Sequence, residues 1–145
     1  MVGHNHPLVA TSYNNIGVVY KEKGDLENAL LQYQRALEIR TRVYGQEHPQ
    51  VADSYNNIGE VYRNKGDLEN ALLQHQRALE IRTRVFGQEH PRVADSYKGI
   101  GMVYHEQGNT EQATEMYTKA YRVYLKVLGP DHPVTLGLKP FVKLD

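Results

Sequence analysis

The chain has 145 residues, and its 17 basic and 17 acidic side chains give a formal net charge of zero. This length fits one ordinary domain, and the balanced charge argues against general nucleic-acid or anionic-membrane binding, which needs excess Lys and Arg. The absence of Cys excludes disulfides, thiolate metal sites and thiol catalysis. No apolar run approaches the roughly 20 residues of a membrane span, and no signal peptide begins the chain, so we expect a cytoplasmic protein without membrane association.

A five-residue motif with the pattern G-x-x-H-P recurs along the chain at a fixed interval, and we call it the corner. GHNHP at 3–7 returns as GQEHP at 45–49 and 87–91 and as GPDHP at 129–133, each 42 residues after the last. Segments 6–47 and 48–89 differ at seven of 42 positions, segment 90–131 is a more divergent copy, and 132–145 begins a fourth copy and then fails. Because self-similarity at such a period is typical of repeat architectures, we predict a single array over residues 1–145, with a partial fourth repeat or cap.

Each copy is predicted to hold two helices. In the first copy, one helical stripe is formed by Tyr13, Ile16, Gly17 and Tyr20, spaced i, i+3, i+4 and i+7. A second apolar face follows at Ala29, Tyr33, Ala36, Leu37 and Val43. Between the helices, Gly24 can take a left-handed conformation and Asp25 can cap the next helix. In the third copy, Asn109 and Gln112 have the spacing of a capping-box variant.

The corner itself is predicted to end one helix and begin the next. Gly45 ends a helix, and Pro49 suits the first helical position because its missing N–H would be unpaired there. His48 then lies at the cap, where its ring can accept a hydrogen bond from a nearby N–H. A metal site is the rival interpretation, but helices pack about 8–10 Å apart. Cap histidines at that spacing are too far apart to share an ion with bonds of about 2 Å, so we predict no metal.

The C-terminal copy is interrupted by a proline. Residues 133–139 begin a first helix, but Pro140 falls on the Asn–Asn pair of the earlier copies. A proline inside a helix costs about 3 kcal/mol or more. We therefore predict a short or kinked helix that serves as a partial lid through Leu136, Leu138 and Phe141.

This pattern of small and aromatic residues resembles the tetratricopeptide repeat. In the second copy the matching residues are Tyr55, Ile58, Gly59, Tyr62, Gly66-Asp67, Ala71, His75 and Ala78. The 42-residue period, the Asn–Asn pair, the "RALEIR" segment and the closing G-x-x-H-P resemble the subclass found in kinesin light chains. The resemblance implies an all-α fold, a right-handed α-solenoid of three helix–turn–helix units plus a short C-terminal capping helix. Single units cannot bury their apolar faces alone, so neighbouring units would stack. In such a stack, the first helices would line a concave groove.

No motif in the chain resembles a catalytic site. Ser12, Ser54 and Ser96 recur because the repeat recurs, which indicates a packing or solvent choice. The "GIGMVY" segment at 99–104 lacks the third glycine and the preceding strand of a nucleotide-binding loop. We therefore expect no enzyme activity and no cofactor.

The candidate peptide-binding residues lie at first-helix positions that are predicted to face away from the core. They are Asn14, Asn15, Lys21, Asn56, Asn57, Arg63, Lys98 and His105. Asn is a mediocre helix former, and its amide can pair with the N–H and C=O of an extended peptide. The family resemblance implicates Asn15 and Asn57 in that contact, whereas the third copy has Gly99 there. Lys21, Arg63 and Lys98 can select an acidic group.

Two functions follow from these residues. The first is a scaffold or adaptor that binds an extended, acidic peptide segment of a protein partner in its concave groove. The alternative is a structural segment of a repeat array, natural or designed, that self-associates through its exposed ends by head-to-tail stacking. For the Asn–Asn pairs, the alternative role is hydrogen bonding between adjacent helices.

Overall fold

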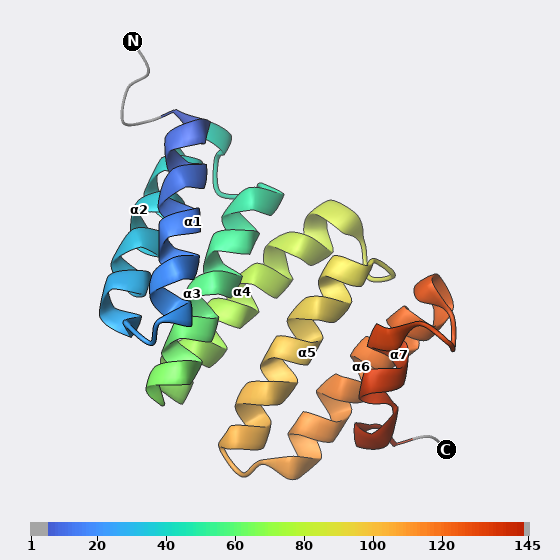
Figure 1. Cartoon of the computed structure of the whole chain (residues 1–145). Helices are drawn as coiled ribbons and strands as arrows, with labels where there is room; N and C mark the ends of the chain where they lie inside the picture. The colour runs from blue at the N-terminus through green and yellow to red at the C-terminus, as the bar shows by residue number, and fades with distance from the viewer. Residues whose placement is uncertain (1–5, 144–145) are drawn as a thin grey trace. The chain divides into compact units, whose positions relative to one another are not determined.

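The computed structural model describes residues 6–143, in which every regular element is helical (Figure 1). The start of the first corner, residues 3–5, and the end of the cap, residues 144–145, lie outside the described residues. The helices are α1 (Pro7–Glu22), α2 (Leu26–Tyr44), α3 (Pro49–Lys65), α4 (Leu68–Phe86), α5 (Pro91–Glu106), α6 (Thr110–Leu128) and α7 (Pro133–Leu138), followed by the 3-10 turn η1 (Lys139–Phe141). The predicted fold class, three helix–turn–helix units and a short C-terminal helix, is confirmed. Within 6–143, no helix is long and apolar enough to cross a membrane.

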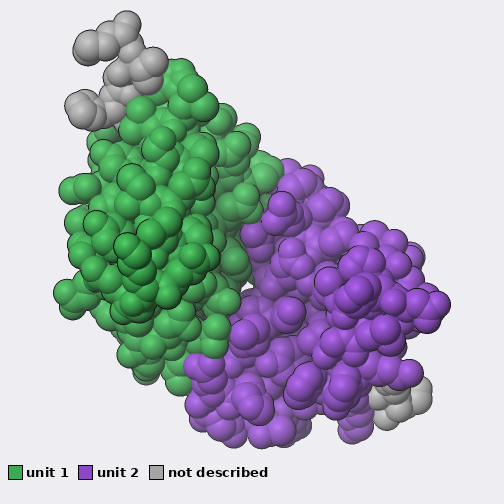
Figure 2. Space-filling view, in the orientation of Figure 1, with its two compact units in different colours: residues 1–81 green, residues 82–145 purple. Residues whose placement is uncertain are grey.

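The chain forms two compact units, residues 1–81 and 82–145 (Figure 2). By its residue bounds, α4 contributes to both units. In the first unit, the buried apolar clusters join α1 to α2, α2 to α3 and α3 to α4. In the second unit, a single larger cluster is centred on α6 and includes Tyr117, Tyr121, Tyr124 and Leu138. Tyrosine thus supplies much of the core volume of the second unit. The single array over 1–145 stays a prediction.

The histidine–proline corners are helix caps, as predicted. His6, His48, His90 and His132 each accept a hydrogen bond at Nδ1 from the backbone N–H two residues later, over 3.0–3.1 Å. Each is followed by a proline at the first helical position. The rings of Tyr44 and Phe86 stack on the cap histidines of their corners, with centroids 4.1 and 4.2 Å apart. The corner is therefore a local structure fixed by the cap bond and by ring stacking.

The glycine of the first-helix stripe permits close packing inside each unit. A Cβ atom built on Gly17 would lie 2.8 Å from the ring of Tyr33, and one on Gly59 would lie 2.9 Å from the ring of His75. Real Cβ atoms do not approach other heavy atoms this closely. Glycine is therefore required at these positions because an aromatic side chain of the second helix packs against the backbone.

Buried arginines join one repeat to the next. Arg40 of α2 donates from Nη1 to Ser54 Oγ of α3 over 2.8 Å, and Arg82 of α4 donates to Ser96 Oγ of α5 over 2.9 Å. All four side chains are buried. The recurring serines at 54 and 96 are therefore packing residues.

Four residues predicted to make apolar contacts are exposed, namely Ile16, Val43, Leu136 and Phe141. Ile16 has 44 % of its surface exposed, although its equivalent Ile58 has only 2 %. The difference arises because α2 covers Ile58, whereas no described helix covers the same face of α1. Val43 also lies at the surface. The predicted lid includes Leu138, which is buried, but Leu136 was placed in it wrongly, since 49 % of Leu136 is exposed.

Candidate functional site

The asparagines of the first unit bond to other side chains of that unit. Asn57 Nδ2 of α3 donates to Asn14 Oδ1 of α1 over 2.8 Å, which joins neighbouring first helices. Asn56 Oδ1 lies 3.1 Å from Nδ1 of the buried His75. Asn15, in contrast, is exposed. Part of the hydrogen-bonding capacity of Asn14, Asn56 and Asn57 is therefore already used within the first unit.

Arg63 is tied to a carboxylate beside the same network. Its Nε lies 2.9 Å from Glu60 Oε2, and His75 Nε2 lies 3.5 Å from the same oxygen. Burial by itself raises the pKa of Glu60, but its interactions with the neighbouring His75 and with the Arg63 guanidinium lower that pKa to about 2. Glu60 therefore stays ionised and offsets the charge of Arg63 toward any acidic ligand. Lys21, the equivalent of Arg63 in the first repeat, is half-buried.

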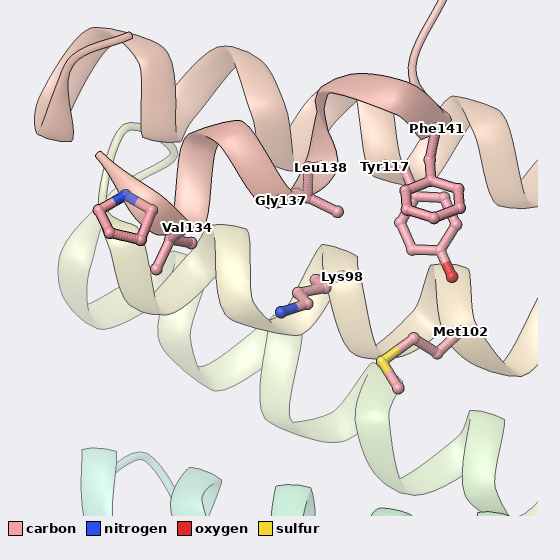
Figure 3. A pocket seen from close by; sticks show the side chains of 8 residues that line it. Lys98, Met102, Tyr117, Val134, Gly137, Leu138 and Phe141 are labelled. Carbon is pink, nitrogen blue, oxygen red and sulfur yellow. The ribbon is translucent and has the colours of Figure 1, made fainter. Parts of the chain in front are cut away.

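In the second unit, Lys98 lies in a groove between α5, α6 and the C-terminal elements (Figure 3). We call it the C-terminal groove. Its volume is about 480 Å³, and its lining consists of Lys98, Met102, Tyr117, Pro133, Val134, Gly137, Leu138 and Phe141. A second hollow of about 200 Å³ is lined by Met102, His105, Glu106, Tyr117 and Phe141. The two hollows share three residues, so Lys98 and His105 lie toward different ends of one apolar floor.

The groove exists because α7, the first helix of the partial fourth repeat, ends early. The helix α7 has six residues, and Pro140 follows within the 3-10 turn. Gly137 adds space, since a Cβ atom there would meet no atom within 4 Å. Phe141 remains 54 % exposed, and its ring centroid lies 5.8 Å from that of Tyr117. The early stop thus leaves the ring of Phe141 exposed next to the buried ring of Tyr117.

Sequence reasoning identified Lys98 and His105 but missed the apolar floor. Met102 and Tyr117 were not among the predicted site residues, and Phe141 was expected to be part of a lid. One signal was present: Met102 occupies the position held by Val18 and Glu60 in the earlier repeats. An apolar side chain beside a predicted binding lysine could have indicated a binding surface.

Family models of the tetratricopeptide repeat match residues 9–50 and 50–126 of the chain. The chain belongs to the tetratricopeptide repeat family. Repeats of this family generally mediate protein–protein interactions and are typically non-catalytic. No curated protein sequence matches this tetratricopeptide repeat chain.

Several solved structures share the fold. BtubC (BKLC) from P. vanneervenii is 32% identical, with a TM-score of 0.80, over 90% of this chain and 52% of that one. A putative kinesin light chain from Podospora anserina with nearly identical TPR-like repeats is 21% identical, with a TM-score of 0.82, over 92% of this chain and 64% of that one. The N-terminal domain of stress-induced protein-1 from C. elegans is 15% identical, with a TM-score of 0.67, over 93% and 95%. The chain thus spans between half and two thirds of the first two relatives, and the predicted resemblance to kinesin light chain repeats is confirmed at the level of structure.

Proposed function

We propose that this protein is a non-enzymatic interaction module of the scaffold or adaptor type, which anchors an extended, acidic peptide in the C-terminal groove. The observation that carries the proposal is the apolar floor of Met102, Tyr117 and Phe141 beside the exposed amine of Lys98. A volume of about 480 Å³ lies within the roughly 300–1,000 Å³ of small-molecule sites. It can accept an apolar side chain and part of its backbone.

The charges around the groove set the direction of the peptide. Glu106 lines the hollow at the His105 end, and its carboxylate would repel an acidic group of the peptide there. An acidic group of the peptide therefore belongs at the Lys98 end, with the apolar anchor over the aromatic pair. Since an exposed ion pair contributes only about 0.2–1 kcal/mol, most of the affinity must come from the apolar anchor.

The asparagines have a smaller part in this proposal. The hydrogen bond between Asn57 and Asn14 supports their alternative role as a link between adjacent first helices. We therefore assign ligand selection to Lys98, while Asn15 and Lys21 remain candidates for contacts along the first unit.

Fluorescence anisotropy with a library of labelled peptides tests the proposal. Each peptide carries one apolar residue flanked by either Asp or Asn. We expect Lys98→Glu to weaken binding of the Asp peptides about tenfold, since an attraction of up to about 1 kcal/mol becomes a repulsion, and to leave the Asn peptides unchanged. Met102→Glu should weaken both sets. The matched control is Lys65→Glu, an exposed lysine at the end of α3. Equal effects of the two lysine substitutions would show that the groove does not select the peptide.

A further inference from the structure

The outer face of α1 has the same residues as a face that is buried in α3. Ile16 and Val19 are 44 % and 48 % exposed, whereas their equivalents Ile58 and Val61 are 2 % and 0 % exposed. In the first unit, Ile58 and Val61 form a cluster with Ala29 and Tyr33 of α2. The packing of α2 on α3 therefore defines what kind of helix fits the exposed face of α1.

Helix α6 has a surface similar to the one by which α2 packs on α3. Ala113, Tyr117 and Ala120 occupy the positions that Ala29, Tyr33 and Ala36 occupy in α2. All three are buried in the cluster that α6 shares with Leu138 of α7. The cover over α6 is short, because it consists of a six-residue helix and a 3-10 turn of three residues. A full first helix such as α1, with 16 residues, would cover the same face over a greater length.

The polar residues that would meet between α6 and the second copy's α1 are also compatible with each other. Where α2 and α3 carry Arg40 and Asp53, α6 carries Tyr124 and α1 carries Thr11. The hydroxyl of Tyr124 already donates to Asp95 of its own unit. Placing α1 on α6 would therefore bury neutral groups against each other. An arginine on α6 would instead have been buried without the carboxylate that accompanies it in the first unit, at a cost of several kcal/mol.

We propose that α1 of a second copy of this chain docks on α6 in the place held by α7 and η1, so that molecules associate head to tail. The two surfaces differ, so the contact is heterologous. The elements α7 and η1 compete with the incoming α1, because Leu138 and Val142 already pack against the cluster of α6 that α1 would cover. As a tethered segment, the cap acts at an effective concentration in the millimolar range, so it holds the wild-type chain largely monomeric. The argument for self-association does not rest on the peptide-binding proposal. The two binding events nevertheless compete, because both use the C-terminal groove.

Analytical ultracentrifugation of the full chain up to about 1 mM tests the inference. Leu138→Ala and Val142→Ser each weaken the cap, and Val142 is only partly buried, so its replacement leaves the fold intact. We expect both variants to associate at concentrations at least tenfold lower than the wild type. Adding Ile16→Glu should return them to monomers, whereas adding Leu31→Glu, an exposed apolar residue of α2, should not.

Two results would overturn the inference. In the first, both cap variants remain folded by circular dichroism and no more associated than the wild type. In the second, Ile16→Glu leaves their association unchanged. A symmetric α1–α1 dimer would respond to Ile16→Glu but not to the cap substitutions, so it would give the first of these results.

Discussion

The hydrogen bond between Arg40 and Ser54 allows a prediction with controls inside the same chain. Ser54→Ala removes the acceptor that lies 2.8 Å from Arg40 Nη1, and the Nε of this buried guanidinium already lacks a partner among the described residues. A hydrogen bond to a charged group contributes about 1.5–3 kcal/mol. Since Ala is the better helix former by roughly 0.5 kcal/mol, we expect Ser54→Ala to lower the free energy of unfolding by about 1.5 kcal/mol.

The matched control is Ser12→Ala, which changes the same position of the first repeat. Ser12 is exposed, and its hydroxyl donates only to the carbonyl of Leu8, over 3.1 Å. This substitution should therefore be neutral or slightly stabilising. Ser96→Ala should cost less than Ser54→Ala, because Arg82 also donates to the carbonyl of Arg92 over 3.4 Å.

Urea unfolding followed by circular dichroism measures the three variants under one set of conditions. A loss of about 1.5 kcal/mol corresponds to a melting temperature lower by about 3–6 °C for a chain of this size. If Ser54→Ala and Ser12→Ala changed the free energy of unfolding by the same amount, the buried hydrogen bond would contribute nothing, and the reasoning about repeat-to-repeat contacts would fail.

Three further changes test other contacts. Gly101→Ala should destabilise by about 1–3 kcal/mol, because its Cβ would lie 2.7 Å from a tyrosine ring; Gly137→Ala, whose Cβ meets no atom within 4 Å, should not, and equal thermal shifts would contradict this. Because the folded-state pKa of Glu60 is about 2 rather than 4.5, its ionised form stabilises the fold above about pH 4.5, and this stabilisation is lost as the pH falls toward 2. Glu60→Gln should therefore be less stable than the wild type at pH 7, by up to about 3 kcal/mol, with the gap closing in urea titrations near pH 2; a gap independent of pH would refute the assignment. His48→Ala should cost about 1–2 kcal/mol by chemical denaturation, since it removes a 3.1 Å cap bond and a stacked ring, and His6→Ala should cost less because its cap is exposed.

The two proposals concern the same end of the molecule, and they place opposite requirements on α7 and η1. A peptide in the C-terminal groove needs α7 and η1 in place, because Val134, Leu138 and Phe141 line it. Head-to-tail docking needs them displaced. A peptide that binds the groove should therefore suppress the association of the cap variants, and sedimentation with and without that peptide would measure the competition.

The local features of the fold were predictable because each depends on neighbours close in the chain. The helix ends follow from Pro49 and its equivalents and from the histidine caps. The short last helix follows from Pro140. For the candidate site, the sequence identified Lys98 but not the groove beside it, because the groove depends on how far α7 extends over α6.

What the sequence by itself determined is the 42-residue period, the paired helices and their caps, since the same short-range forces act in every copy. It could not determine which copy's apolar face is covered. Ile16 and Ile58 lie in the same local sequence, Tyr-Asn-Asn-Ile-Gly, yet 44 % of one and 2 % of the other is exposed. Only the tertiary structure decided this, because burial depends on whether another helix packs against that face.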